Sequence, residues 1–407
     1  MLGGSKALPS CKAPMNRSQT LILIIFFLCA VIARTCSLPE RPFFCDVPAS
    51  VAAVETGAMR IQFPGYVPFH LAIKAFGSIF GGAFAGAVFF SLLCGMGAVL
   101  YCALFAYERA GFPGALLALA VMGFSPIAIY FSCVGASYTT DLLGMSALIY
   151  HGNRVLTKRS GRDYKYAVLW FVFGCLMRSL SFPFVGLGLL YLLWKCPTRN
   201  HIVFTAVVFT LGGFLYSAVT FFYFGALNAI IASVGPAKGA GLHPVTVAWM
   251  AGNEVRNILF TGWSLNIFIF IVLAFLWFAR KQLNGTLCVF FILLTLPYFC
   301  FLLWYICHAG YICLLLPAFI CAPWLAEERF WLDSRAISLA AIFGIISFLQ
   351  FFVARPIPFT GPVSLVLNSY ILTYTYQGIK QGMFDNLQNW ASKTHLGGEH
   401  TESGKRF

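Results

Sequence analysis

Long apolar runs, separated by short polar breaks, occupy most of this chain. The first run is Thr20–Ala33 and the last is Ile337–Val353. Runs of roughly 15 to 25 apolar residues are long enough to cross a bilayer as helices. The pattern predicts an all-α polytopic membrane protein with about eleven spans. The runs between these two are Gly81–Tyr107, Phe112–Phe131, Thr140–His151, Tyr166–Met177, Phe182–Trp194, Ile202–Phe224, Leu259–Phe278, Leu287–Ile306 and Tyr311–Leu325.

Three of these runs leave alternatives open. Thr140–His151 is a poorly hydrophobic span. Tyr166–Met177 and Phe182–Trp194 are each short for a crossing, with Arg178 between them, so they form either two spans or one bent helix. The basic start before Thr20 is compatible with a cleaved signal peptide, but the many later spans favour a retained first helix.

Composition and charge support the membrane interpretation. The chain is 60% hydrophobic and 10% charged, whereas soluble domains carry about 25% charged residues. The net charge of +14 comes from Lys and Arg in the breaks between runs, as the positive-inside bias predicts, which argues against nucleic-acid binding. With the N-terminus inside, the basic breaks 154–165, 195–199, 280–281 and 329–335 all face the cytoplasm.

Two long loops and a tail then face outward. The first outer loop covers residues 35–78 and the second covers 225–258, while 354–407 form a polar C-terminal tail on the outer face. Cys36 and Cys45 share the first outer loop and either pair in an oxidising compartment or remain two thiols. We expect a transmembrane module over 1–325, followed by a last span within 326–353.

The first outer loop holds the carboxylates of interest. Asp46 beside the membrane can act as a general base toward a hydroxyl acceptor, and Glu55 can face the same cavity. A solvated loop Asp or a helix N-cap is the structural alternative for Asp46. Farther along, Pro64–Pro68 forms a rigid corner into an amphipathic helix that we expect to lie in the membrane interface.

That helix carries an apolar stripe, and two polar residues are expected to share its other side. Phe69, Ile73 and Phe76 make the stripe, while His70 and Lys74 lie opposite and are candidates for substrate binding. Lys74 either meets a lipid phosphate or anchors the helix by snorkelling.

Other candidates for substrate binding lie near the outer ends of later spans. Arg178 stands between two apolar runs, where a charge is costly and its planar fork suits a phosphate. Tyr138 and Asp141 flank the start of the fourth span, Asp141 being either a helix stabiliser or a cavity-facing carboxylate. Arg256 and His308 can neutralise a departing phosphate. We expect no cofactor, and the spacing requires no metal.

The first outer loop resembles that of the GT-C membrane glycosyltransferases. Phe43–Asp46, followed by Phe63–Pro68, is similar to the bacterial protein-O-mannosyltransferase-like group, and so is Phe124–Pro126 in the third span. The resemblance implies a GT-C-like bundle in a bacterial inner (plasma) membrane. It also implies an inverting transferase that moves a sugar from a polyprenyl-phosphate donor to a glycan, lipid or protein acceptor. Asp46 would be the base and Arg178 the phosphate ligand.

The chain also departs from that group. Its second acidic residue falls at Ala49 or Ser50 here, and Phe63 stands where the group has a His. A catalytically inactive relative that keeps the fold is therefore one alternative. A transporter or lipid flippase is another, although the internal repeats and matched broken helices of transporters are not evident in the sequence.

Overall fold

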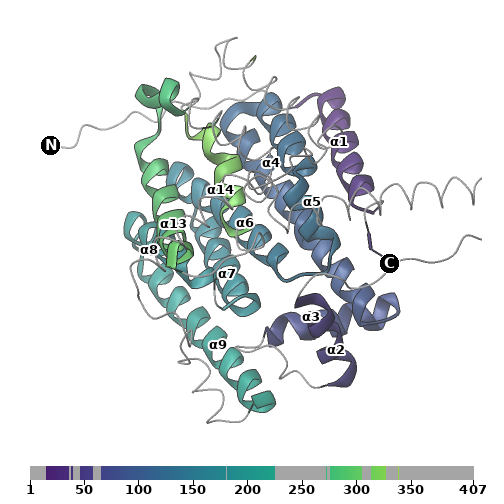
Figure 1. Cartoon of the computed structure of the whole chain (residues 1–407). Helices are drawn as coiled ribbons and strands as arrows, with labels where there is room; N and C mark the ends of the chain where they lie inside the picture. The colour runs from purple at the N-terminus through teal and green to yellow at the C-terminus, as the bar shows by residue number, and fades with distance from the viewer. Residues whose placement is uncertain are drawn as a thin grey trace, which may run out of the picture.

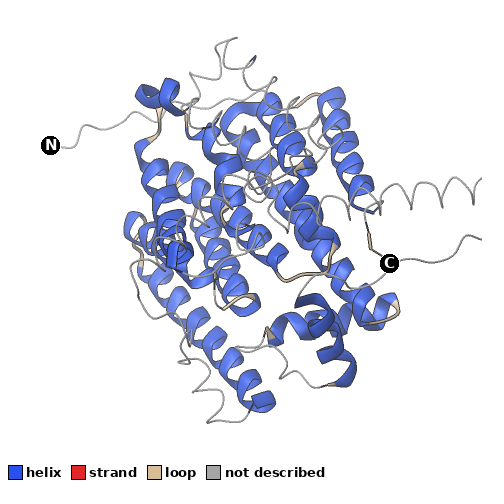
Figure 2. Cartoon of the chain, viewed as in Figure 1, coloured by secondary structure: helices blue, strands red, loops and turns tan. Residues whose placement is uncertain are grey.

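The computed structural model describes residues 15–35, 38–39, 46–57, 66–179, 181–224, 272, 276–304, 313–326 and 338. Within these residues the regular elements are helices, apart from an isolated bridge between Leu283 and Ala326 (Figure 2). The α-helices are α1 Arg17–Thr35, α2 Asp46–Thr56, α3 Val67–Phe80, α4 Ala83–Phe124, α5 Pro126–Cys133, α6 Tyr138–Lys158, α7 Gly161–Met177, α8 Gly186–Lys195, α9 Arg199–Phe224, α13 Gly285–Trp304 and α14 Leu316–Cys321. Short 3₁₀ helices are η1 Phe182–Val185, η2 Arg280–Gln282 and η4 Ala322–Leu325.

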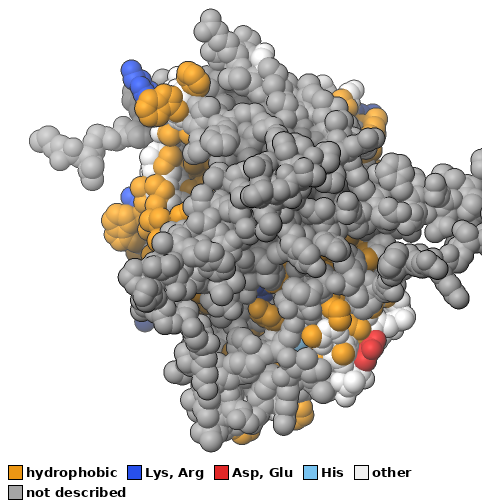
Figure 3. Space-filling view, in the orientation of Figure 1, with side chains coloured by type: hydrophobic (Ala, Val, Ile, Leu, Met, Phe, Trp, Pro, Cys, Tyr) orange, Lys and Arg blue, Asp and Glu red, His pale blue; other side chains and the backbone are white. Residues whose placement is uncertain are grey.

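The helices form one bundle, which agrees with the prediction of an all-α integral membrane protein (Figure 1). Among the described residues, α1, α4 and Arg199–Val219 are long and apolar enough to cross a membrane. Large apolar side chains such as Leu190, Trp194 and Ile292 are exposed on the outside, where lipid would lie. Figure 3 shows apolar side chains along the edge of the bundle that carries α8 and α13. The count of eleven spans stays a prediction, because the second outer loop, the tail and most of the runs 259–278 and 337–353 lie outside the described residues.

The predicted break after Tyr107 is a kink inside α4. Gly111 has φ 69° and ψ −154°, a conformation that glycine adopts readily, and it separates two helical segments. The second segment ends at Phe124, and α5 continues the same predicted span after Ser125. The run Phe112–Phe131 is therefore two helical pieces joined at Ser125–Pro126.

A buried arginine stabilises that join. Pro126 has no N–H to donate to the carbonyl of Met122, one helical turn earlier. Arg34, at the end of α1, donates instead to the carbonyls of Gly123 at 2.6 Å and Met122 at 3.3 Å. Its guanidinium is completely buried, so the end of α1 is tied to the break in the third predicted span.

The short runs around Arg178 are two helices that run in opposite directions. α7 ends where the N–H of Arg178 bonds to the carbonyl of Gly174. At the far end of α8, the carbonyl of Lys195 accepts a hydrogen bond of 2.6 Å from Arg159, which lies two residues before the start of α7. The chain has therefore turned back on itself, and this contact excludes one bent helix over 166–194.

The predicted cytoplasmic breaks 154–165, 195–199 and 280–281 lie at one end of the bundle, which we call the basic end, whereas 329–335 lies outside the described residues. Arg109 binds the carbonyls of Trp324 and Ala326 at 3.0 and 3.1 Å, and Asn284 binds the carbonyl of Leu325. Glu108 pairs with Arg154 at 3.0 Å and Lys158 at 2.7 Å. The other end, which carries α2 and α3 at the bottom of Figure 1, we call the α3 end.

Asp163 at the basic end provides a test of the fold. It lies ahead of the apolar part of α7 and contacts His151 at 2.8 Å and Arg154 at 2.9 Å. Burial alone would raise the pKa of its carboxyl, but hydrogen bonds from Ser160, His151 and Arg154 outweigh burial and hold the pKa below its usual range. The contacts of Asp163 with His151 and Arg154 therefore stabilise the fold fully at pH values above the pKa that Asp163 has in the unfolded chain. This stabilisation is lost as the pH falls through the lower pKa that Asp163 has in the folded protein.

We expect Asp163→Asn to lower the free energy of unfolding by about 1–3 kcal/mol near neutral pH, because Arg154 loses its ionised partner and the contact with His151 loses a carboxylate oxygen. Thermal unfolding in detergent between neutral and acidic pH checks this. The difference in unfolding temperature between wild type and variant should become smaller at low pH. A difference that stays constant would show that the charge of the Asp163 carboxylate is not the cause.

Candidate active site

A buried ion pair stands at the α3 end, between the end of α7 and the start of α6. The Nε of Arg178 lies 3.0 Å from Oδ2 of Asp141, and both side chains are fully buried. Asp141 is in the first turn of α6, where a carboxylate suits the helix N-terminus. Arg178 caps α7 with φ −141° and ψ 77°, so the helix stops at the residue that forms the pair.

Two serines complete the hydrogen bonding of this pair. Ser181 donates from its hydroxyl to the two carboxylate oxygens of Asp141 at 3.1 and 3.0 Å. Ser137 accepts from Nη1 of Arg178 at 3.1 Å. A buried pair is stable only when such extra partners are present, since each charge has left water. The arrangement therefore holds the guanidinium in one orientation.

Two tyrosines flank the guanidinium. The Cζ of Arg178 lies 4.1 Å from the ring centre of Tyr138 and 5.3 Å from that of Tyr66. Tyr138 opens α6, whereas Tyr66 belongs to the predicted corner of the first outer loop and directly precedes α3. The structure thus brings the first outer loop against Arg178, Tyr138 and Asp141, which are three of the predicted site residues.

Asp46 is the first residue of α2, and its side chain lies outside the described structure. α2 packs against α3 and α4, and α3 begins at the residue after Tyr66. Glu55 is exposed in the last turn of α2. Nine residues of helix, at about 1.5 Å each, put Glu55 about 13 Å from Asp46 along the axis.

The prediction that His70 lies opposite the apolar stripe of α3 is wrong. His70 is fully buried beside Phe69 and Ile73, whereas Lys74 is exposed. The reason is the close approach of α3 to α4: a Cβ added at Gly86 would overlap the carbonyl of Ile73. Because the backbones of α3 and α4 touch there, residues of α3 on either side of the apolar stripe, including His70, are buried as well.

The imidazole of His70 has an unusual environment. Among the described residues neither ring nitrogen has a hydrogen-bond partner, and burial lowers the pKa of His70 to about 4. A neutral imidazole offers one N–H donor and one acceptor nitrogen. An unpaired buried polar group costs stability and calls for an explanation, such as a role in binding.

The segment that carries this cluster is similar to a known family. Residues 67–224 match the dolichyl-phosphate-mannose-protein mannosyltransferase family. This segment is mannosyltransferase-like. The match confirms the resemblance to the GT-C mannosyltransferases, and it runs from the start of α3 to the end of α9. A comparison with curated proteins finds no match to the chain.

The mannosyltransferase-like segment contains His70, Lys74, Tyr138, Asp141 and Arg178, whereas Asp46 and Glu55 precede it. Arg256 and His308 lie outside the described residues, as do Cys36 and Cys45. Sequence reasoning did not assign Ser137 or Ser181 to the site. A serine four residues before Asp141 and another three residues after Arg178 were the available signals, because those spacings place side chains near each other at helix ends.

Proposed function

We propose that the chain is an inverting glycosyltransferase that moves a sugar from a polyprenyl-phosphate donor to an acceptor hydroxyl on the outer face of a bacterial inner membrane. The observation that carries the proposal is the position of Arg178. It is held by Asp141 against the first outer loop, inside the segment that matches the mannosyltransferase family. A guanidinium oriented in advance can stabilise a departing phosphate at no further ordering cost.

The proposed step is a single displacement at the anomeric carbon of the sugar. The carboxylate of Asp46 takes the proton of the acceptor hydroxyl, and the acceptor oxygen forms the new bond to the anomeric carbon. The bond to the phosphate oxygen breaks on the opposite face, so the configuration inverts and polyprenyl phosphate leaves as an anion. Arg178 donates hydrogen bonds to that phosphate, while Asp141 and Ser137 keep its guanidinium in place.

The remaining candidates have supporting roles in this proposal. The neutral imidazole of His70 hydrogen-bonds a polar group of the bound substrates, and the ring of Tyr138 supports the guanidinium of Arg178. Exposed Lys74 meets lipid headgroups at the interface, and Arg256 and His308 add positive charge near the phosphate. Glu55, exposed and about 13 Å from Asp46 along α2, contributes little to catalysis.

The direct test uses the full chain in nanodiscs with a labelled mannosyl polyprenyl phosphate and a panel of glycan, lipid and peptide acceptors. We expect transfer of the label with inversion at the anomeric carbon, read by NMR of the product. Movement of the intact donor between leaflets without any sugar transfer would instead support the flippase interpretation and overturn the proposal.

Replacing His70 is expected to affect stability and sugar transfer in opposite directions. We expect His70→Leu to raise the free energy of unfolding by about 1 kcal/mol, since it removes a buried unpaired polar group. The same change should lower transfer at least about tenfold, as one lost hydrogen bond to substrate would. Thermal unfolding and initial rates are measured side by side, with Ser78→Ala, an exposed change on α3, as control. Unchanged transfer with raised stability would make His70 a packing residue.

A further inference from the structure

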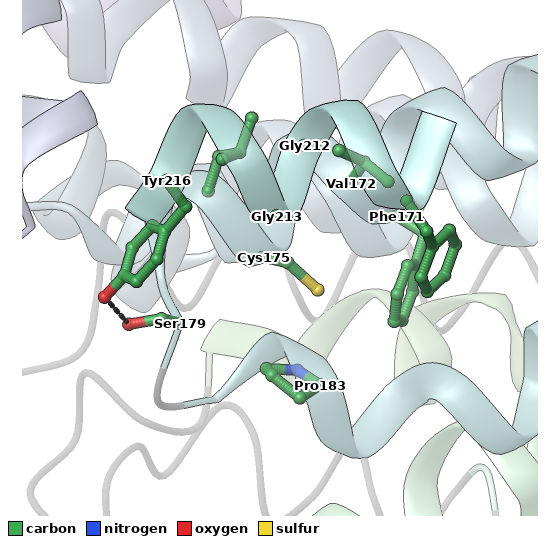
Figure 4. A pocket seen from close by; sticks show the side chains of 10 residues that line it. Phe171, Val172, Cys175, Ser179, Pro183, Gly212, Gly213 and Tyr216 are labelled. Atoms are coloured by element: carbon green, nitrogen blue, oxygen red, sulfur yellow. Dashed lines mark hydrogen bonds between the residues drawn. The ribbon is translucent and has the colours of Figure 1, made fainter. Parts of the chain in front are cut away.

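A groove of about 240 Å³ lies between α7, η1 and α9 (Figure 4). We call it the α7/α9 groove. Its walls are mainly apolar, and its polar atoms gather at one end, where the hydroxyl of Tyr216 donates to that of Ser179 at 3.1 Å. Its lining includes Phe171, Val172, Ser179, Gly213 and Tyr216.

The groove exists because α9 presents glycines toward α7 where a larger side chain would fill the space between these two parallel helices. α7 and α9 touch at Tyr164 and Thr205 near their starts, at Phe171 and Phe209 in the middle, and at Ser179 and Tyr216 near their outer ends. Gly212 sits against Val172, but a Cβ at Gly213 would meet no atom within 4 Å. Gly213 is also exposed, so the groove is open to the outside of the bundle and a lipid chain can enter it there.

The position of the groove relates it to the candidate active site. Ser179, at the hydroxyl end, directly follows Arg178, whose guanidinium faces Asp141 on α6. Neighbouring positions on α9 are open to the membrane, since Leu211 is 62% and Phe214 is 72% exposed. A ligand entering from the bilayer would thus place an apolar chain along the groove and a polar head beside the candidate site.

The size and chemistry of the groove limit what binds there. A cavity of roughly 150 Å³ takes up benzene and stays dry, so this larger groove accommodates a short length of branched hydrocarbon. Apart from the two hydroxyls at one end, its lining offers nothing for a sugar to hydrogen-bond. The groove therefore matches the chain of a lipid and not the sugar of a donor.

We propose that the α7/α9 groove binds the isoprene units nearest the phosphate of the donor lipid, with the phosphate at the Ser179–Tyr216 end. The proposal rests on the proposed function, since it assigns the donor's chain to a place beside Arg178. Acyl chains of bilayer lipids share the apolar chemistry, but the hydroxyl end, which includes the residue after Arg178, favours a lipid that carries a phosphate at its head.

The test fills the groove from Gly213. In Gly213→Leu the new side chain enters open space, and leaving glycine favours the helix, so the variant should fold. The probe is sugar-free farnesyl phosphate carrying a fluorophore, bound to the full chain in phosphatidylcholine nanodiscs. We expect about tenfold weaker binding for Gly213→Leu and an intermediate loss for Gly213→Ala. Leu211→Phe adds bulk on the exposed side of α9 and should bind as wild type does.

Farnesyl phosphate has no sugar, so binding tests the groove even if no transfer is ever observed. Unchanged affinity in Gly213→Leu would overturn the proposal, and so would an equal loss in Leu211→Phe. A photo-crosslinker placed at Val172 distinguishes the two lipid sources. Capture of farnesyl phosphate supports the donor chain, whereas capture of phosphatidylcholine alone would overturn it.

Discussion

Replacing Asp46 by Asn is expected to abolish sugar transfer while the protein remains folded. A positioned general base contributes about 10²–10⁴-fold to such reactions, and an amide cannot take the proton of the acceptor. Asp46 is the first residue of α2, so Asn in its place loses only a charge interaction with the helix N-terminus, about 0.3–1 kcal/mol, and the protein should still fold. The variant therefore separates the charge of Asp46 from its structural role.

The measurement is the initial rate of transfer from the polyprenyl-phosphate donor, together with thermal unfolding in the same detergent. Glu55→Gln is the matched comparison, because it removes a carboxylate from the exposed far end of the same helix. We expect a loss of at least about 10²-fold for Asp46→Asn and little change for Glu55→Gln. The reverse result would move the base to Glu55, and full activity in both would remove α2 from the chemistry.

The helices were largely predictable because apolar runs long enough to cross a bilayer are visible without any tertiary information. The break at Gly111 also followed from its polar neighbours Glu108 and Arg109. Length alone did not decide between two helices and one around Arg178. The antiparallel arrangement of α7 and α8 depends on a long-range contact, the hydrogen bond from Arg159 to Lys195.

Sequence alone predicted the charged residues of the candidate site, whose burial in a membrane protein costs free energy, but not its serines. Arg178 and Asp141 stood out because charges near apolar runs are expensive. Ser137 and Ser181 did not, since serine is tolerated almost anywhere in a helical bundle and signals nothing on its own. The role of Arg34 was not predicted for a different reason. It donates hydrogen bonds to carbonyls beside the break at Pro126, and these belong to a distant part of the sequence.

His70 shows the limit of periodicity as evidence. The spacing of Phe69, Ile73 and Phe76 marks an apolar stripe on α3, and the sequence alone predicts that His70 lies opposite this stripe. Which of the flanking residues become buried depends on how closely α3 approaches α4, and that distance is set by Gly77 and Gly86. A helical-wheel argument contains no information about the partner helix.

Arg178→Ala is expected to reduce both stability and transfer, and separating the two effects is the informative step. Removing Arg178 leaves Asp141 charged and fully buried without its partner, a change that costs about 3–5 kcal/mol. A single variant that fails to fold would say nothing about the donor. The double variant Arg178→Met with Asp141→Leu removes both charges and keeps apolar volume, and such replacements are often neutral or stabilising.

The double variant therefore decides what the guanidinium does. If Arg178 only balances Asp141, the double variant folds and transfers sugar at the rate of wild type. If Arg178 also holds the donor phosphate, the double variant folds but transfers at least about 10²-fold more slowly, because the departing anion has lost its donor. We expect the second result, with weaker binding of sugar-free polyprenyl phosphate and unchanged binding of the acceptor. Equal loss for donor and acceptor would make the pair a structural element of the α6–α7 contact.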